Sequence, residues 1–235
     1  MMPLLSIVIP AHDEERFLGA TLEALNEGIA AADIASHEIV VVDDASTDRT
    51  AEIARAAGAR VVASGKRNIA ASRNAGARAT TGSRLLFVDA DTLVTGAALQ
   101  AVMRAFDEGV VGGGARMAWD RRVRLSGELA LHAWNIISAA SASPAGGFFF
   151  MTRNAWETAG GFDETVYVSE ELWLGFALRK IGRVKIIDPK VVTSSRKLQS
   201  HSMKEFLSLF ARLARSPFRT IRDRRALDLW YVRRH

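Results

Sequence analysis

The chain has 235 residues and no cysteine, which excludes a disulfide framework and a thiolate metal site and agrees with a reducing cytoplasm. Hydrophobic residues make up 49% of the chain, enough for a sizeable core, so intrinsic disorder is excluded. The chain has no run of about 18 apolar residues, and its N-terminus lacks a basic leader and a cleavage site. We therefore expect neither a membrane-spanning helix nor secretion.

The formal net charge of +5 is concentrated near the C-terminus, where residues 204–235 hold nine Arg or Lys and three Asp or Glu. Apolar residues recur at helical spacing from Met203 to Arg215, so we expect residues 201–235 to form a basic amphipathic helical tail. Such a tail suits a membrane surface, a nucleic acid or water, and charge alone does not choose among them. We expect a cytoplasmic protein with this tail as the candidate peripheral membrane contact, and no nucleic-acid partner.

Strand and helix patterns alternate through the first half of the chain. Short apolar runs rich in β-branched residues predict strands at Leu4–Ile9, Glu38–Val42, Arg60–Ala63 and Arg84–Val88. Helical stripes separate them, at residues 17–25, 48–57 and 67–79, and Ser46 and Thr47 are candidate caps for the second helix. This alternation predicts a mostly parallel sheet covered on both faces, with ligands beyond the carboxyl ends of its strands.

The regular alternation of predicted strands and helices ends after Gly109. We expect strands at residues 110–117 and 147–151 and helices at residues 125–138 and 170–181. The order of these elements is mixed rather than doubly wound. The sequence therefore predicts an α/β domain over residues 1–200, with a Rossmann-like half at 1–110 and a mixed half at 111–200.

Polar clusters follow three of the predicted strands, at residues 11–14 (AHDE), 43–46 (DDAS) and 89–91 (DAD). Because the carboxyl ends of parallel strands meet at one edge of a sheet, these clusters are expected to lie together. Carboxylates gathered at one edge are hard to explain by structure alone. This edge is the candidate site.

The segment LLFVDADT, residues 85–92, delivers Asp89 and Asp91 from the end of a buried strand, with the small Ala90 between them. Magnesium or manganese takes such oxygen ligands and leaves positions open for phosphate oxygens and water. A turn or a helix cap explains the same residues without a metal. The pattern also matches the DxDxT signature of haloacid-dehalogenase-like phosphatases, but that family carries it on its first strand.

Two further groups suit a nucleotide. Asp43 and Asp44 need hydrogen-bond donors at a sheet edge, which a pyrimidine N–H or a ribose hydroxyl supplies; a cap with Ser46 is the alternative, but the other carboxylate clusters at this edge favour a functional role. Arg67 and Arg73 precede the acidic strand; a solvated helix face is the alternative, but guanidinium groups match phosphate oxygens, and a nucleoside diphosphate carries negative charge that a metal only partly neutralises.

Five segments, in this order, resemble the family 2 glycosyltransferases, inverting enzymes of the GT-A fold. They are residues 6–14 (SIVIPAHDE), 41–48 (VVDDASTD), 71–76 (ASRNAG), 87–91 (FVDAD), and 160–164 (GGFDE) followed by Glu170 and Glu171. The resemblance spans about residues 4–200 and rests on the order of the segments, since no single one is specific.

The resemblance implies a nucleoside-diphosphate sugar donor, linked to uridine or guanosine, and an acceptor hydroxyl. It implies Asp91 as the principal ligand of Mn²⁺ or Mg²⁺, with Asp89 holding the sugar or ribose or reaching the metal. It assigns the nucleotide sugar to Pro10, Ala11, Glu14, Asp43, Asp44, Arg73, Asn74, Asp89 and Ala90.

The general base implied by the resemblance is Glu171, the second residue of the acidic pair. The family more often has Glu-Asp there, so the choice between Glu171 and Glu170 stays open, and a helix N-terminus with Ser169 as cap explains both residues without catalysis. The expected reaction is a direct displacement with inversion at the anomeric carbon. The loop 193–197 is either a candidate to close over the diphosphate or an ordinary basic loop, and His201 is a candidate metal ligand or a surface residue.

Two rival classes stay in view. A nucleotidyltransferase needs a glycine-rich, lysine-bearing loop after its first strand, whereas residues 11–14 are acidic. A catalytically silent sugar-nucleotide binder requires degraded acidic motifs, and these are largely intact. Neither the acceptor nor the oligomeric state can be predicted from the sequence.

Overall fold

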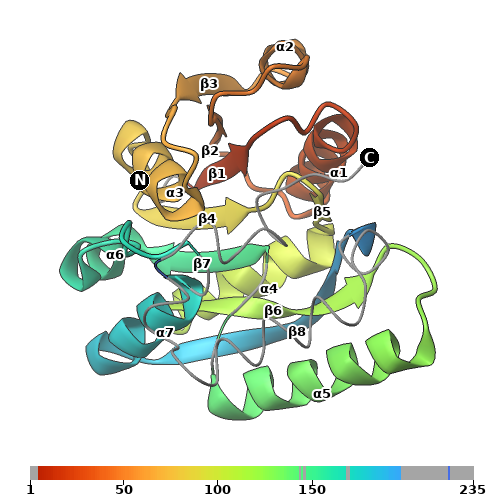
Figure 1. Ribbon diagram of the computed structural model, residues 1–235. Helices are drawn as coiled ribbons and strands as arrows, with labels where there is room; N and C mark the ends of the chain where they lie inside the picture. Colours follow the sequence, from red (N-terminus) through yellow and green to blue (C-terminus); the bar gives the residue numbers. More distant parts are fainter. Residues whose placement is uncertain (1–4, 143, 145–146, 168–169, 197–221, 223–235) are drawn as a thin grey trace.

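A computed structural model describes residues 5–142, 144, 147–167, 170–196 and 222 (Figure 1). The predicted tail, apart from Arg222, and the candidates Ser169 and His201 lie outside these residues. The described strands are β1 Leu5–Ala11, β2 His37–Asp43, β3 Arg60–Ala63, β4 Arg84–Val88, β5 Thr92–Leu93, β6 Gly112–Trp119, β7 Phe148–Thr152 and β8 Val184–Thr193. The described helices are α1 Leu18–Ala31, α2 Thr50–Ala56, α3 Ile69–Ala79, α4 Gly96–Asp107, α5 Leu125–Ser141, α6 Arg153–Ala159 and α7 Glu170–Ile181.

One mixed sheet runs through the described residues in the order β3-β2-β1-β4-β7-β6-β8-β5. The first four strands in this order are parallel, with Ile7 of β1 paired to Ile39 on one side and to Leu86 on the other. Strand β7 is antiparallel to both β4 and β6, and β6 and β8 are parallel to each other. The sheet confirms the predicted α/β fold and its mixed second half. Strands β1, β2, β4 and β6 all end at the same edge.

Helices cover both faces of the sheet, which explains why its strands are apolar on both sides. Ile7 and Ile9 of β1 face a core formed with α1 and α4, whereas Val8 faces a second core formed with α3 and α7. In β7, Phe149 belongs to the second core and Phe150 to the first, following the alternation of a strand. Both halves of the chain therefore contribute to the same two cores.

Two predicted boundaries need correction, and three elements were missed. Helix α2 begins at Thr50 without a side-chain cap, because the hydroxyl of Ser46 accepts from the N–H of Asp13 and the hydroxyl of Thr47 donates to the Asp13 carboxylate. Helix α3 begins at Ile69, where the Asn68 side chain caps it. Helices α4 and α6 and the two-residue strand β5 had not been predicted; each helix begins after a capping threonine, Thr95 or Thr152.

Helix α3 approaches β1 and β2 closely at Gly76. A Cβ atom placed there would lie 2.2 Å from Cγ1 of Val8 and 2.9 Å from Cγ2 of Val42. We predict that Gly76→Ala lowers the free energy of unfolding by about 1–3 kcal/mol through overpacking, measured by urea denaturation. The control is Gly19→Ala in α1, where the nearest atom is 3.8 Å away, and it should leave stability unchanged or higher. Equal effects of the two substitutions would contradict this packing argument.

Candidate active site

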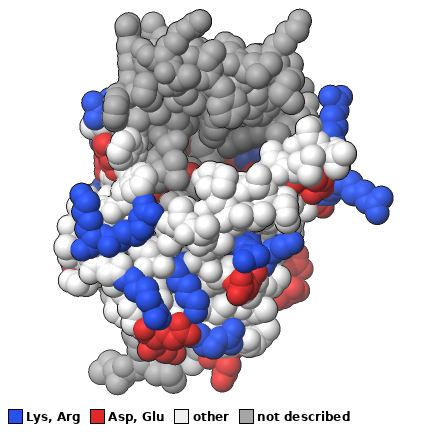
Figure 2. Space-filling view, turned by 90° about the horizontal axis from the view of Figure 1, so that it is seen from below, with Lys and Arg blue, Asp and Glu red and all other residues white. Residues whose placement is uncertain are grey.

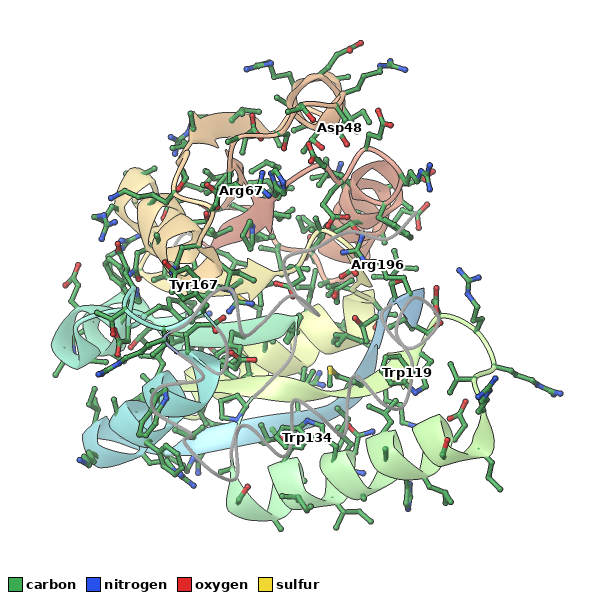
Figure 3. All side chains as sticks on the ribbon, in the orientation of Figure 1. Asp48, Arg67, Trp119, Trp134, Tyr167 and Arg196 are labelled. Atoms are coloured by element: carbon green, nitrogen blue, oxygen red, sulfur yellow. The ribbon has the colours of Figure 1, made fainter. Side chains whose placement is uncertain are left out.

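The structure brings the predicted carboxylates together at the edge where β1, β2 and β4 end. Glu14 follows β1, Asp44 follows β2, and Asp89 and Asp91 follow β4. Figure 3 labels Arg67 beside the end of β2 and Arg196 between α1 and the end of β8, on the same side of the sheet. Residues from five parts of the chain therefore share this edge.

Asp44 is buried and anchors the loop that leads into α3. Its two carboxylate oxygens accept hydrogen bonds from the backbone N–H of Arg67 at 2.7 Å and of Asn68 at 2.9 Å. Arg67 has a φ of 50°, in the left-handed region, and these bonds offset the cost of that conformation. Asp43 accepts a hydrogen bond from the N–H of Ser46 at 3.0 Å. This contact is the local bond with Ser46 that the sequence offered as the alternative to a nucleotide contact. Contacts of either residue with a nucleotide base remain a prediction.

Three other residues that were assigned to the nucleotide sugar lie at or just after the ends of β1 and β4. Pro10 is half-buried and Ala11 is buried at the end of β1. Ala90 is buried between the two aspartates, and its carbonyl accepts a hydrogen bond from Oγ1 of Thr21 at 2.8 Å. The backbone between Asp89 and Asp91 is therefore fixed against α1.

Arg73 is a buried cation that connects the two halves of the site. Its Nη2 donates to Oδ1 of Asp89 at 2.9 Å, and its Nη1 donates to Oε1 of Glu170. Burial opposes the charge, but Asp89 and Glu170 hold the pKa of Arg73 above its usual value. Among the described residues, its Nε has no hydrogen-bond partner. Arg73 thus fixes the start of α7 against the end of β4.

Glu170 and Glu171 form the first turn of α7, and their surroundings differ. Glu170 is buried, and burial together with the neighbouring charge of Glu171 raises its pKa to about 8, although Arg73 acts in the opposite direction. Glu171 is only half-buried. Glu170 is therefore the carboxyl held by the protein, and Glu171 is the more accessible of the two.

Arg196 follows β8 and ties it to the carboxylates of the site. Its guanidinium donates to both carboxylate oxygens of Glu14, each at 2.7 Å, and lies 3.0 Å from Oδ2 of Asp91. Its Cζ stands 4.8 Å from the centre of the Phe17 ring. Burial disfavours the charge, but the bonds to Glu14 and the charge of Asp91 raise the pKa of Arg196. The only sequence signal for this role was a basic loop after a strand.

Asn74, assigned to the nucleotide sugar by resemblance, contacts protein in this structure. Its amide nitrogen donates to the carbonyl of Phe162 at 2.8 Å, and its oxygen accepts from the N–H of Phe162 at 2.9 Å. The same side chain contacts Glu164 and Trp156. Asn74 therefore holds the GGFDE segment against α3, and a nucleotide contact remains a prediction.

A divalent cation fits the carboxylates of β4 only if the substrate supplies further ligands. Within the described residues, no group of three or more His, Cys, Asp or Glu has the geometry to hold a metal ion. Asp89 and Asp91 offer oxygen ligands at one strand end, and magnesium with a nucleotide commonly uses one or two carboxylates together with phosphate oxygens and water. The residues present therefore fit a cation bound jointly with a diphosphate.

A cavity of about 380 Å³ lies beyond the end of β6, between that strand and α5. Trp119, Arg121, Arg122, His132 and Lys190 are among the residues that line it. It is close to the carboxylate edge, since Trp119 pairs with Thr193 of β8, which pairs with Thr92 of β5. Its basic and aromatic lining suits a polar molecule that carries negative charge.

Comparison with known proteins matches residues 6–139 to the family model described as Glycosyl transferase family 2. The uncharacterized glycosyltransferase EpsJ of Bacillus subtilis (strain 168) is 30% identical over 138 residues, which cover 55% of this chain and 39% of that protein. The chain thus matches less than half the length of this curated relative.

Solved structures resemble the whole described fold at low identity. A mannosyltransferase of Pyrobaculum calidifontis, solved with GDP-Man and Mn²⁺, has a TM-score of 0.68 at 22% identity, covering 97% of this chain and 70% of that one. Glucosyl-3-phosphoglycerate synthase of Mycobacterium tuberculosis, solved with Mn²⁺, UDP and glucosyl-3-phosphoglycerate, has a TM-score of 0.63 at 18% identity, covering 91% and 78%. The fold is that of the GT-A glycosyltransferases, as the sequence resemblance implied. None of the helices described in this chain is long and apolar enough to cross a membrane.

The raised pKa of Glu170 predicts a pH dependence of stability. An unfolded glutamate loses its proton near pH 4.5 and the folded residue near pH 8, so between these values the folded state binds more protons and the free energy of unfolding falls as pH rises. Glu170→Gln removes this titration. The melting temperature of the variant minus that of the wild type should increase from pH 5 to pH 9. Parallel pH profiles would instead mean that Arg73 keeps Glu170 ionised in the folded protein.

Proposed function

This chain belongs to glycosyl transferase family 2, and from that premise we propose that it transfers a sugar from a nucleoside-diphosphate sugar to an acceptor hydroxyl. The observation that carries the proposal is the joining of the Asp89-Ala90-Asp91 segment to the start of α7 through Arg73. This contact holds the donor-side carboxylates and a candidate base in one site. A DxDxT phosphatase is disfavoured because Asp89 lies after β4 rather than after the first strand.

The donor lies along the ends of β1 and β2 in this proposal. Pro10 and Ala11 line the nucleoside pocket, and Asp43 and Asp44 face the base. Support comes from the two solved relatives, one with GDP-Man and Mn²⁺ and the other with UDP and Mn²⁺. The nucleoside is uridine or guanosine.

Asp91, assisted by Asp89, holds Mn²⁺ or Mg²⁺ together with the donor diphosphate. A bound cation of this kind stabilises the negative charge that develops on the leaving diphosphate. Arg196 is the second source of positive charge. Its guanidinium is bonded to Glu14 and Asp91 in the ligand-free chain, and phosphate oxygens match the same fork. On donor binding, Arg196 turns part of its hydrogen bonding from these carboxylates to the diphosphate.

Glu171 is the general base in this mechanism. It accepts the proton of the acceptor hydroxyl as the oxygen bonds to the anomeric carbon, while the bond from that carbon to the diphosphate breaks on the opposite face. The anomeric configuration is therefore inverted. Glu170 positions the start of α7 through Arg73, which leaves the half-buried Glu171 to face the acceptor.

We predict that Glu171→Gln lowers the rate of transfer by about 10²-fold or more, the usual range for loss of a general base, and leaves binding of the nucleoside diphosphate unchanged. Transfer is measured as release of nucleoside diphosphate, and binding by calorimetry. The control is Glu23→Gln on the exposed side of α1, which should behave as wild type. Full activity of Glu171→Gln would remove this residue from the mechanism and move the search to Glu170.

We also predict that UDP or GDP raises the melting temperature only when Mn²⁺ or Mg²⁺ is present. A ligand at about one hundred times its Kd stabilises a protein by about 2.7 kcal/mol, a readily measured shift. Asp91→Asn should lose the metal-dependent part, whereas Asp188→Asn, at an exposed position of β8, should keep it. Stabilisation of the wild type by nucleotide without metal would remove the cation from the proposal and leave sugar transfer standing.

A further inference from the structure

The outer face of α5 is an exposed apolar surface far from the ends of β1 and β2. Leu125 is 74% exposed, Leu129 60%, and Ile136 and Ile137 56% each. On a helix of 3.6 residues per turn these four side chains fall within an arc of about 120°. The remaining residues of this arc are small and uncharged: Ser126, Ala133 and Ala140. Over 17 residues, α5 therefore presents no charged side chain on this face.

The opposite side of α5 explains how the helix is held. Leu131 and Ser138 are buried, and the Asn135 side chain forms two hydrogen bonds with the backbone of Met117 in β6, both at 2.9 Å. The charged or titratable residues of the helix, Glu128 and His132, line the cavity beside β6. The buried residues and the hydrogen bonds of Asn135 thus lie toward the protein, the exposed Glu128 and His132 flank the apolar arc, and the leucine and isoleucine side chains point outward.

The apolar surface continues onto α7. Phe176 is 50% exposed and Trp173 is 43% exposed, with their ring centres 6.2 Å apart. Arg179 connects the two helices, because its Nη1 donates to the carbonyl of Ser141 at the end of α5 and its Cζ lies 4.5 Å from the Phe176 ring. The two helices therefore form one continuous surface, hereafter the α5–α7 face.

Basic residues stand at both ends of this face. Arg121, Arg122 and Arg124 are exposed just before α5, and Arg179 and Lys180 are exposed near its other end. In the view from the α5 side, Figure 2 shows a band of uncharged atoms with Lys and Arg to both sides, and Lys, Arg, Asp and Glu intermixed below it. An apolar centre with positive ends complements the interface of an anionic bilayer.

A second copy of the chain is a poorer partner for the same face. In an antiparallel contact the arginines before α5 would meet Arg179 and Lys180 of the other copy, and in a parallel contact each cluster would meet itself. Like charges face each other in both cases, which disfavours association. Residues 204–235, with nine Arg or Lys and three Asp or Glu, are also basic overall and supply little opposite charge. Anionic lipids supply it.

We propose that the α5–α7 face docks on a bilayer that contains anionic lipid. The leucine and isoleucine side chains of α5 lie at the boundary between headgroups and acyl chains, and the arginines at both ends bind lipid phosphates. This face is distinct from the C-terminal tail. The inference does not depend on the chemistry of sugar transfer.

The test measures partition of the full chain onto vesicles, by flotation. Wild type should bind vesicles of phosphatidylglycerol and phosphatidylcholine (3:7) and bind weakly to phosphatidylcholine alone. The double variant Leu129→Glu/Ile136→Glu should bind the anionic vesicles at least ten-fold more weakly. Its matched control, Ala20→Glu/Ala56→Glu, adds the same charge at exposed positions of α1 and α2 and should bind nearly as wild type. All variants keep the tail, so its contribution is common to them.

Neutral substitutions separate the apolar contribution from charge and from misfolding. Leu129→Gln/Ile136→Gln should melt as wild type and still lose most vesicle binding. The proposal would be overturned if the glutamate and the glutamine variants of Leu129 and Ile136 both bound anionic vesicles as the wild type does. It would also be overturned if the wild type did not bind anionic vesicles. A dimer in light scattering that becomes a monomer in the glutamate variant, with vesicle binding unchanged, would likewise overturn it and assign the face to a second copy.

Discussion

The hydrogen bonds of the buried Arg73 guanidinium are the constraint on which the site depends. The guanidinium lies between Asp89, at the end of β4, and Glu170, at the start of α7. A buried cation that loses its carboxyl partners is left uncompensated, so such a group tolerates little displacement. It therefore fixes the distance between the strand that leads to Asp89 and Asp91 and the helix that carries Glu171. These two segments come from different halves of the chain, and the common sheet alone would not set the position of a helix terminus.

Much of this arrangement follows from local sequence. The apolar runs before Pro10, Asp43 and Asp89 predict strands whose polar ends meet at one edge, and the structure confirms that geometry. The first turn of α7 at Glu170 and Glu171 was also predicted. These features are predictable because they rest on the periodicity of a buried strand or an amphipathic helix, which involves only nearby residues.

Long-range contacts could not be predicted in the same way. Arg196 bonds to Glu14 across 182 positions of sequence, and nothing local to either residue specifies the other. Asn74 sits in a segment that resembles a ligand-binding motif, yet its amide is occupied by the backbone of Phe162. The order β4-β7-β6-β8 also depends on which strand edges are left open after the parallel half forms, and the sequence pattern does not encode that choice.

The two-residue strand β5 has a mechanical consequence. It pairs Thr92, directly after Asp91, with Thr193, the last residue of β8, while Asp120 accepts two hydrogen bonds from Ser195. The chain just before Arg196 is therefore held at Thr193 and again at Ser195. A guanidinium that follows such an anchored segment reorients mainly by rotation of its side chain. In the proposed mechanism, Arg196 exchanges its carboxylate partners for the diphosphate when the donor binds. The net affinity of Arg196 for diphosphate is therefore the difference between its two sets of ion pairs. After transfer, the return of Arg196 to the carboxylates helps to release the nucleoside diphosphate.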